Sequence, residues 1–391
     1  MNDYNLTERL YSKCGPVLRY RIATEMMDNA QADIKGLQKD LLSQDEVQEN
    51  IKYYAFGAEQ GKRGEYFYTK RHGSKPELLD NISSKMIHGS KRELLENMAA
   101  KLWSFGIRRG FEEIDKYLET YIKIMEYDYN RKGVMRVGYG KNAIAQFLSL
   151  LGYANEQSVY RIMQTRLDQL YAFVLKERYD IYINADDYSG IPSNWKDEDK
   201  IIDPALTTYS DEEGEPPLPF IYDIFGFIGM KQAGLTEDNE RKINAVLKYF
   251  LDERYQKNIK PGYGILLAPT GSFYGCGWSI HLPGFGQELN ESIDINKLHI
   301  NQLLLRLELL SHFSITRDLP HMAELYNFFE RYRDKDGFYC FPKEFIPENK
   351  TGYFVMGLRM GLVENRKKKD GYIAESTFRV LKMKKNLGLY K

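Results

Sequence analysis

The pattern that decides the fold is clearest in residues 143–175, AIAQFLSLLGYANEQSVYRIMQTRLDQLYAFVL. An almost wholly apolar segment runs to Gly152, and an amphipathic segment begins after a short link, near Ser158. Glycine is favoured just past the end of a helix because it adopts the left-handed backbone conformation without a steric penalty. The stretch therefore predicts a helix pair whose first helix is buried and whose second helix exposes one face to solvent.

The same pattern recurs along most of the chain. Apolar helices are predicted to end near Gly106, Gly152, Gly234, Phe313 and Gly361, and an amphipathic segment follows each of them. The intervals fit a unit of roughly 40–50 residues with insertions in the middle, which is typical of helical repeats. Helix pairs of this kind bury their apolar faces only by stacking on one another. We therefore predict an all-α protein.

A short duplication lies near the N-terminus. Residues 71–86, RHGSKPELLDNISSKM, are echoed by residues 87–102, IHGSKRELLENMAAKL. In each copy a serine is followed three residues later by a glutamate, which is the pattern of a capping box at a helix N-terminus. We predict two short helices capped by Ser74 and Ser90, and the alternative is a site built from the histidine of each copy.

Charge and cysteine content restrict the functional class and the compartment. The 391 residues contain 55 Lys plus Arg and 55 Asp plus Glu, so no net field attracts nucleic acid or an anionic membrane. The three cysteines, Cys14, Cys276 and Cys340, are widely spaced and odd in number, so we predict no disulfide framework. The first residues lack the apolar stretch of a signal peptide. The most apolar run, 218–230, is too short to cross a bilayer. We predict a cytoplasmic protein that binds neither nucleic acid nor membrane, and its oligomeric state stays open.

Further features carry a resemblance to a known family. Glycine–aromatic turns follow predicted outer helices, in residues 260–269, 332–342 and 367–376. The chain also pairs CGPVLRYRIATEMM at 14–27 with ESTFRVLKMKK at 375–385. With these features it resembles the prenyltransferase/squalene-cyclase superfamily, and within it the bacterial prenyltransferase-like repeat proteins. The resemblance covers most of residues 5–390.

The resemblance implies an α/α toroid, a ring of helix hairpins, with an N-terminal helical extension and irregular middle loops. Residues 1–105 would supply N-terminal helices that pack on the toroid or open it, and residues 106–391 would supply the repeats, all in one continuous domain. A central cavity would bind or convert a small apolar ligand of the isoprenoid type, without a cofactor. Because toroids host many chemistries and also binding proteins, the sequence leaves open whether this chain is an enzyme.

The sharpest candidate for catalysis is residues 184–187, Asn-Ala-Asp-Asp. Class II terpene cyclases on the toroid use a D-x-D-D motif whose middle aspartate must stay in the acid form to protonate an alkene or epoxide. The resemblance then implies that Asp186 is the acid and that Asp187 is the last aspartate of the motif. Asn184 departs from the motif and removes one partner. The alternative interpretation is a solvated acidic turn, which the flanking loop residues favour.

A second candidate site is the glycine-rich, aromatic stretch at 271–286, GSFYGCGWSIHLPGFG. Glycine lets the backbone approach a ligand closely, and Tyr274, Trp278 and Phe285 would offer it their ring faces. His281 would transfer protons near neutral pH. The alternative is a tight loop with packed aromatic residues and a surface histidine. The thiols of the chain lack the ligand spacing of zinc prenyltransferases, so we predict no metal site.

Three functions remain open. The first is a toroid that binds or converts an isoprenoid. The second is a carbohydrate-active toroid, a hydrolase or lyase with paired carboxylates, for which Asp223 and the acidic loop residues Glu212, Glu213 and Glu215 are candidates. Asp223 would also contact the substrate. The third is a toroid without catalysis that binds a ligand or a protein partner.

Overall fold

The computed structural model is mainly helical, which confirms the all-α class at this level. It describes residues 2–27, 33–72, 87–129, 135–184, 186, 189, 191, 193, 200–206, 218–267, 273–286 and 299–391. Contacts divide the chain into two compact units: unit 1 is Met1–Arg63, Lys85–Leu118 and Pro283–Lys391, and unit 2 is Gly64–Ser84 and Glu119–Leu282. Closure of the helices into a toroid, and a domain boundary after residue 105, stay predictions.

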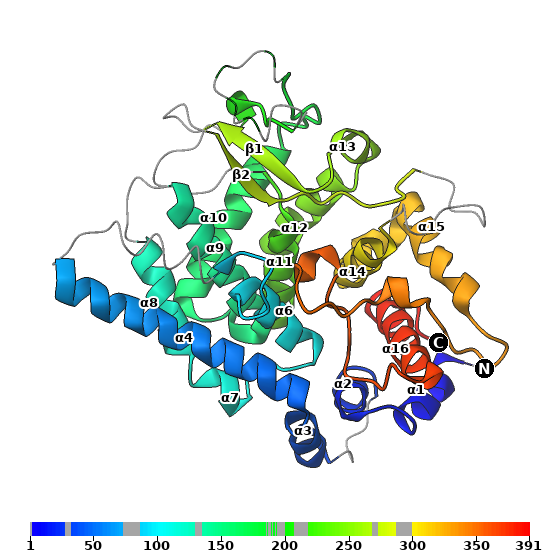
Figure 1. The fold of residues 1–391 in the computed structure, drawn as a ribbon. Helices are drawn as coiled ribbons and strands as arrows, with labels where there is room; N and C mark the ends of the chain where they lie inside the picture. The colour runs from blue at the N-terminus through cyan, green and yellow to red at the C-terminus, as the bar shows by residue number, and fades with distance from the viewer. Residues whose placement is uncertain are drawn as a thin grey trace. The chain divides into compact units, whose positions relative to one another are not determined.

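Unit 1 is built from helices of both ends of the chain (Figure 1). Its helices are α1 (Asp3–Tyr11), α2 (Pro16–Glu25), α3 (Ile34–Leu42), the first part of α4 (Asp45–His72), α6 (Leu95–Ser104), α7 (Glu112–Asp115), α14 (Ile300–Leu310), α15 (Pro320–Phe328) and α16 (Lys369–Asn386). α1 packs against α16, and the backbone N–H of Asp3 donates to the carbonyl of Lys391 at 2.6 Å. Pro16 opens α2, because a first-turn residue needs no intrahelical N–H bond.

α14 is buried on all sides, as its sequence INQLLLRLELL predicts. Only Asn301 and Glu308 keep partial exposure among its residues. The helix packs against α16 and against two 3-10 turns, η8 (Lys343–Phe345) and η9 (Phe354–Met356). Two charged residues, Arg306 and Glu308, interrupt its apolar surface. Arg306 is 2% exposed, and its Nε and Nη1 have no hydrogen-bond partner in the described part of the chain. Burial lowers the pKa of Arg306 to about 10.

Arg306→Met should raise the free energy of unfolding, by about 1–2 kcal/mol, because methionine fills the same space without the cost of burying a charge that has no counter-ion among the described residues. Urea denaturation measures the change. Arg379→Met is the matched control, since the guanidinium of Arg379 is paired with Glu308 and its removal should destabilise the protein. A loss of stability in Arg306→Met would mean that Arg306 has a counter-charge in solution.

Unit 2 is built around the contact of α11 with α9 and η2. Its elements are most of α8 (Leu118–Tyr129), α9 (Met135–Leu148), the π-helical turn η2 (Ser149–Tyr153), α10 (Gln157–Val174), the 3-10 turn η5 (Pro204–Leu206), α11 (Ile221–Ala233), α12 (Glu237–Phe250), α13 (Glu253–Asn258), β1 (Tyr263–Leu267) and β2 (Phe273–Trp278). The strands form an antiparallel hairpin in which Ile265 lies opposite Gly275. The all-α prediction did not include this hairpin, whose ladder pairs backbone groups that a loop would leave unpaired.

Two glycines let α11 approach its neighbours closely. A Cβ at Gly229 would lie 2.0 Å from the carbonyl oxygen of Ser149, and a Cβ at Gly226 would lie 2.3 Å from the end of the Met163 side chain. The hydroxyl of Ser149 also donates to the carbonyl of Gly226 at 2.9 Å. The backbones of α11 and η2 therefore touch at this point, and the glycines in the apolar run serve packing.

Gly229→Ala should lower the free energy of unfolding by about 1–3 kcal/mol, because the added methyl group meets backbone that cannot move aside. Gly226→Ala is the matched control, since its methyl group meets the flexible end of Met163 and should cost less. Thermal denaturation of both variants measures the difference. Equal losses would contradict the explanation by backbone contact.

The predicted hinge glycines are confirmed at three positions. Gly106, Gly152 and Gly234 have φ values of 85°, 95° and 96°, which lie in the left-handed region. Gly106 follows the end of α6, Gly152 lies in η2 after α9, and Gly234 caps α11. The sequence pattern therefore locates these helix ends correctly.

The helix predicted to end at Gly361 is wrong, because η9 is the only helical turn in that segment. Side-chain amides bind its backbone in place of helical hydrogen bonds. The N–H of Phe354 donates to Oδ1 of Asn97 at 2.7 Å, and Nδ2 of Asn301 donates to the carbonyl of Met356 at 2.8 Å. Apolar composition alone does not reveal such long-range partners.

The capping box predicted at Ser90 is also wrong. α6 begins at Leu95, and its N-cap, Leu94, makes no side-chain cap. Glu96 instead accepts from the N–H of Gly89 and lies 3.1 Å from Nδ1 of His88. The first copy of the duplication, with its expected cap at residue 74, lies outside the described residues.

Candidate functional site

A cavity in unit 1 lies where α2, α6, α14 and α16 converge. Its inner space measures about 30 Å³. A buried water needs at least about 10–15 Å³, so this space suits two or three waters or one small oxyanion. Its charged lining residues are Arg21, Glu308, Arg359, Arg379 and Lys382. Its large apolar lining residues are Trp103, Phe354, Met360, Phe378 and Met383.

Helical spacing brings the lining residues to common faces. Arg379 and Asn386 lie two turns apart on α16, and Glu308 on α14 lies four residues before His312. Ser311 is the C-cap of α14, and its hydroxyl accepts a hydrogen bond from Nδ2 of Asn386 at 3.0 Å. This bond ties the ends of the two helices together at the cavity.

Arg379 and Glu308 form a buried ion pair on the cavity wall. Nη1 of Arg379 donates to both carboxylate oxygens, at 2.5 and 2.6 Å, and its Nη2 donates to the carbonyl of Met360. Burial raises the pKa of Glu308, and Arg379 offsets this in part. Nε of Arg379 has no hydrogen-bond partner among the described residues. The pair balances its own charge and keeps one donor unused.

Glu25 balances only one of the three cations around it. Its carboxylate accepts from Nε and Nη2 of Arg21 at 2.9 Å each, and it lies 3.2 Å from Arg108 and 3.4 Å from Lys382. Burial favours the neutral acid, but these cations hold the pKa of Glu25 well below its usual range. Burial lowers the pKa of Lys382 although Glu25 opposes this. Net positive charge therefore remains at this wall.

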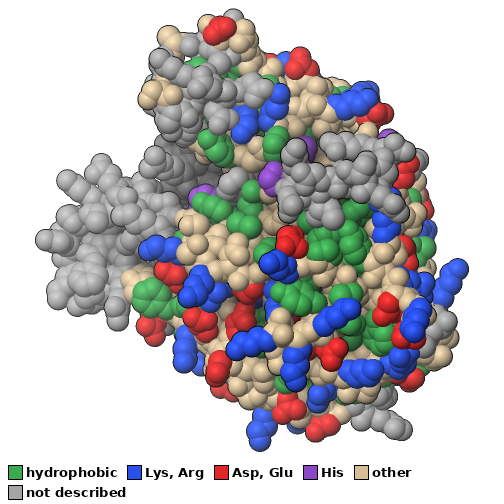
Figure 2. Space-filling view, turned by 45° about the vertical axis from the view of Figure 1, so that its right-hand side comes forward, with side chains coloured by type: hydrophobic (Ala, Val, Ile, Leu, Met, Phe, Trp, Pro, Cys, Tyr) green, Lys and Arg blue, Asp and Glu red, His purple; other side chains and the backbone are tan. Residues whose placement is uncertain are grey.

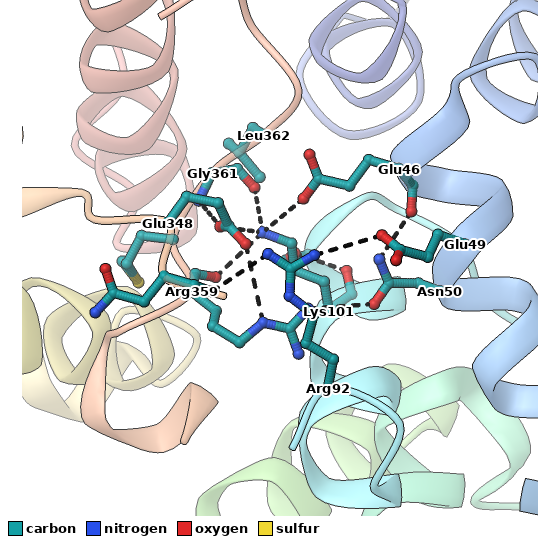
Figure 3. Close-up of polar contacts among 12 residues, drawn as sticks. Glu46, Glu49, Asn50, Arg92, Lys101, Glu348, Arg359, Gly361 and Leu362 are labelled. Carbon is teal, nitrogen blue, oxygen red and sulfur yellow. Dashed lines mark hydrogen bonds and ion pairs between the residues drawn. The ribbon is translucent and has the colours of Figure 1, made fainter. Parts of the chain in front are cut away.

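A buried network beside the cavity fixes the position of Arg359 (Figure 3). Lys101 is fully buried, and its Nζ donates to Oε2 of Glu348 and to the carbonyl of Gly361, both at 2.6 Å. The carbonyl of Arg359 accepts from the same Nζ at 3.2 Å, and Nε of Arg359 lies 3.8 Å from Oε1 of Glu348. Burial lowers the pKa of Lys101, and Glu348 and Glu46 oppose this. Lys101 thus holds both the backbone and the counter-ion of Arg359.

Lys101→Met should lower the free energy of unfolding by about 3–5 kcal/mol, because it leaves Glu348 in a buried place without its nearest cation. Lys52→Met, at an exposed position on α4, is the matched control and should change stability little. Urea denaturation compares the two variants. If Lys101→Met and Lys52→Met changed the free energy of unfolding equally, the buried network around Lys101 would not stabilise the fold.

His312 directly follows the C-cap of α14 and lines the cavity. Its ring centroid lies 5.9 Å from that of Trp103, and part of the side chain keeps accessible surface. The pKa of His312 lies well below its ordinary value, first because burial disfavours the imidazolium ion and then because Lys382 and Arg108 repel it; Glu25 opposes this shift. The imidazole is therefore neutral at pH 7, with one donor and one acceptor nitrogen.

Several buried donors at the cavity lack an acceptor among the described residues. They are Nε1 of Trp103, Nε and Nη1 of Arg359, and Nε of Arg379. Trp103 is 5% exposed and Arg359 is 1% exposed. A buried donor without an acceptor costs about 1–3 kcal/mol. An oxyanion suits this wall because each of its oxygens accepts several hydrogen bonds from charged donors.

The structure places Asp186 at the surface. It is exposed, and its N–H donates to Oδ1 of Asn184 at 3.3 Å. Asp187 lies outside the described residues. Asp186 is not among the residues that line the cavity of unit 1. Its role as a catalytic acid stays a prediction.

The glycine-rich stretch forms β2 and the turn after it. Tyr274 and Trp278 lie on β2, and their side chains are outside the described part of the structure. His281, in unit 2, is partly buried. Phe285 belongs to unit 1, where its ring centroid lies 5.0 Å from that of His321. The catalytic role of His281 and the ligand contacts of the aromatic residues stay predictions.

Asp223 is buried in unit 2, and four hydrogen bonds occupy its carboxylate. Nε and Nη2 of Arg166 donate to its two oxygens at 2.9 Å each, and Nε2 of Gln146 donates at 2.7 Å. The N–H of Phe220 donates to Oδ2 at 2.8 Å, which caps the start of α11. The carboxylate thus anchors α11 to α10 and α9, and its contact with a substrate stays a prediction.

The sequence did not reveal the cavity residues, although the two segments that carry the resemblance contain three of its charged ones. Arg21 lies in CGPVLRYRIATEMM, and Arg379 and Lys382 lie in ESTFRVLKMKK. Both segments place charges within helices whose other residues are largely buried. A charged residue within an otherwise buried helix is the signal that could have pointed to this site.

Comparisons with known protein families, with curated proteins and with solved structures gave no match. Within the described ranges, no helix combines the length and the apolar character that a membrane span requires. The same residues contain no group of three His, Cys, Asp or Glu side chains arranged as metal ligands. The geometry of unit 1 is thus the basis for assigning a function.

Proposed function

We propose that unit 1 binds a small molecule through an anionic group of the phosphate or carboxylate class, held in the cavity beside α16. The observation that carries this proposal is the excess of cations on the cavity wall: Arg21, Arg359, Arg379 and Lys382 face one carboxylate, Glu308. An uncompensated ion in the interior costs several kcal/mol. A bound anion supplies the missing charge.

Counter-ions just outside the wall leave the excess in place. Glu25 offsets one of the three cations that touch it, Glu308 offsets only Arg379, and Glu348 is shared between Lys101 and Arg359. The exterior differs from this cavity, because Lys and Arg side chains mingle with Asp and Glu over the visible face (Figure 2). The positive charge is therefore concentrated in a buried place, where low polarity strengthens its attraction for an anion.

The apolar part of the wall suits a ligand that also carries hydrocarbon. Trp103, Phe354 and Phe378 offer ring faces, and Met360 and Met383 adapt to varied shapes. A prenyl phosphate or diphosphate combines both parts: the inner space of about 30 Å³ would take only its anionic head, and its hydrocarbon would pack against the apolar lining outside that space. This ligand class is the one that the resemblance to the prenyltransferase/squalene-cyclase superfamily suggests. We propose the α/α toroid and membership of this superfamily together with the ligand class. The proposal concerns binding and makes no claim about catalysis.

The test is thermal denaturation and titration calorimetry of the full chain with four probes: inorganic phosphate, acetate, farnesyl diphosphate and farnesol. We expect the anionic probes to raise Tm, farnesyl diphosphate to bind most tightly, and farnesol to have no effect. Binding by farnesyl diphosphate but not by phosphate or acetate would assign the ligand to the prenyl class. If no anionic probe binds, the proposal is wrong.

Lys382→Met should weaken binding of the anionic probes at least about tenfold, which corresponds to about 1.4 kcal/mol. Arg21 and Arg108 still balance Glu25 in this variant, so the fold is retained. Lys368→Met removes an exposed lysine and is the matched control, with unchanged affinity expected. Equal affinity of both variants would show that the anionic probes do not bind in the cavity.

A further inference from the structure

We infer that the anion and a proton bind to unit 1 together, and that His312 is the group that takes up the proton. The inference rests on the anion site proposed above and specifies the ionic form in which that site binds its ligand. It follows from the position of His312 on the cavity wall and from the charges that surround this wall.

Charged groups from most elements around the cavity lie near this place. They are Arg21 and Glu25 from α2, Arg108 from the chain after α6, Glu308 from α14, Arg359 with its counter-ion Glu348, and Arg379 and Lys382 from α16. Cations outnumber carboxylates, and burial removes the water that would solvate an imidazolium ion. Without an anion, the neutral imidazole is therefore the stable form.

An oxyanion at the same wall reverses this preference. An opposite charge within about 4–6 Å favours the charged form of a titrating group. The imidazolium ion also has two N–H donors, whereas the neutral ring has one. Because linkage is reciprocal, an anion that favours protonation of His312 is itself bound more tightly when His312 is protonated.

The sign of the pH dependence follows from this linkage. The free protein keeps His312 neutral until the pH is well below the ordinary value of 6.5. The anion raises the pKa of His312 from that low value. Between the free and the bound pKa, each unit of acidification strengthens anion binding by up to about tenfold for one linked proton. Above the bound pKa, affinity does not change with pH through this group.

Sulfate is the suitable probe, because its own charge stays constant from pH 5 to 8 and any linked proton then belongs to the protein. Titration calorimetry of the full chain with sulfate, in buffers of different ionisation enthalpy, counts the protons taken up. We expect a fraction of a proton near pH 7, rising toward one as the pH falls. Affinity measured from pH 5 to 8 should rise in the same direction.

His312→Gln should bind sulfate without proton uptake and with little pH dependence. His321→Gln, which alters a partly exposed histidine on α15, is the matched control and should keep the uptake. NMR titration of the His312 ring in the native protein gives a second measurement that needs no variant. Its pKa should rise when sulfate is added.

The outcomes separate the two proposals. Sulfate binding without proton uptake, or an unchanged pKa of His312, overturns the inference and leaves the anion site standing. Uptake that persists in His312→Gln also overturns it, because Glu308 or Lys382 would then be the acceptor. If sulfate, phosphate and the other anionic probes all fail to bind, the proposed function itself is wrong.

Discussion

The hydrogen bonds of one buried ammonium group organise the irregular part of unit 1. Lys101 holds Glu348 and the carbonyls of Arg359 and Gly361, in a segment that forms no α-helix. Between those two carbonyls lies that of Met360, which accepts from Arg379 on α16, and Arg379 in turn binds Glu308 on α14. Three helices thus meet through a few residues of extended chain, and the cavity forms at their meeting point.

This arrangement favours a defined site over maximal stability. Replacing buried ionic groups by well-packed apolar residues is often neutral or stabilising, so buried charges are weak evidence of a role in stability. The donors on Trp103 and Arg359 that have no acceptor among the described residues add to the cost. A ligand that binds only the folded state returns this free energy, in proportion to its concentration relative to its dissociation constant.

Local signals predicted the helices well and the site poorly. Apolar periodicity identified α10, α11 and α14, and hinge glycines such as Gly152 and Gly234 located helix ends, because these features depend on a few neighbouring residues. The segment before Gly361 was predicted wrongly, because amides of Asn97 and Asn301, distant in sequence, bind its backbone. The cavity is lined by segments spread along the chain from Arg21 to Asn386, and no local pattern reports which buried charges meet.

The chain segments that form unit 1 also set an order of folding events during synthesis. Its parts come from three separate stretches of chain, whereas unit 2 comes mainly from 119–282. Most of the residues of unit 2 are synthesised long before α16 leaves the ribosome, since α16 ends at Asn386. Domains fold as their residues emerge, so the N-terminal helices α1 and α2 must wait, with apolar surface uncovered, for their late partner. The core of unit 1 is thus completed only once α16 has been made, and α1 and α2 stay without this partner for longer than any other helix of the unit.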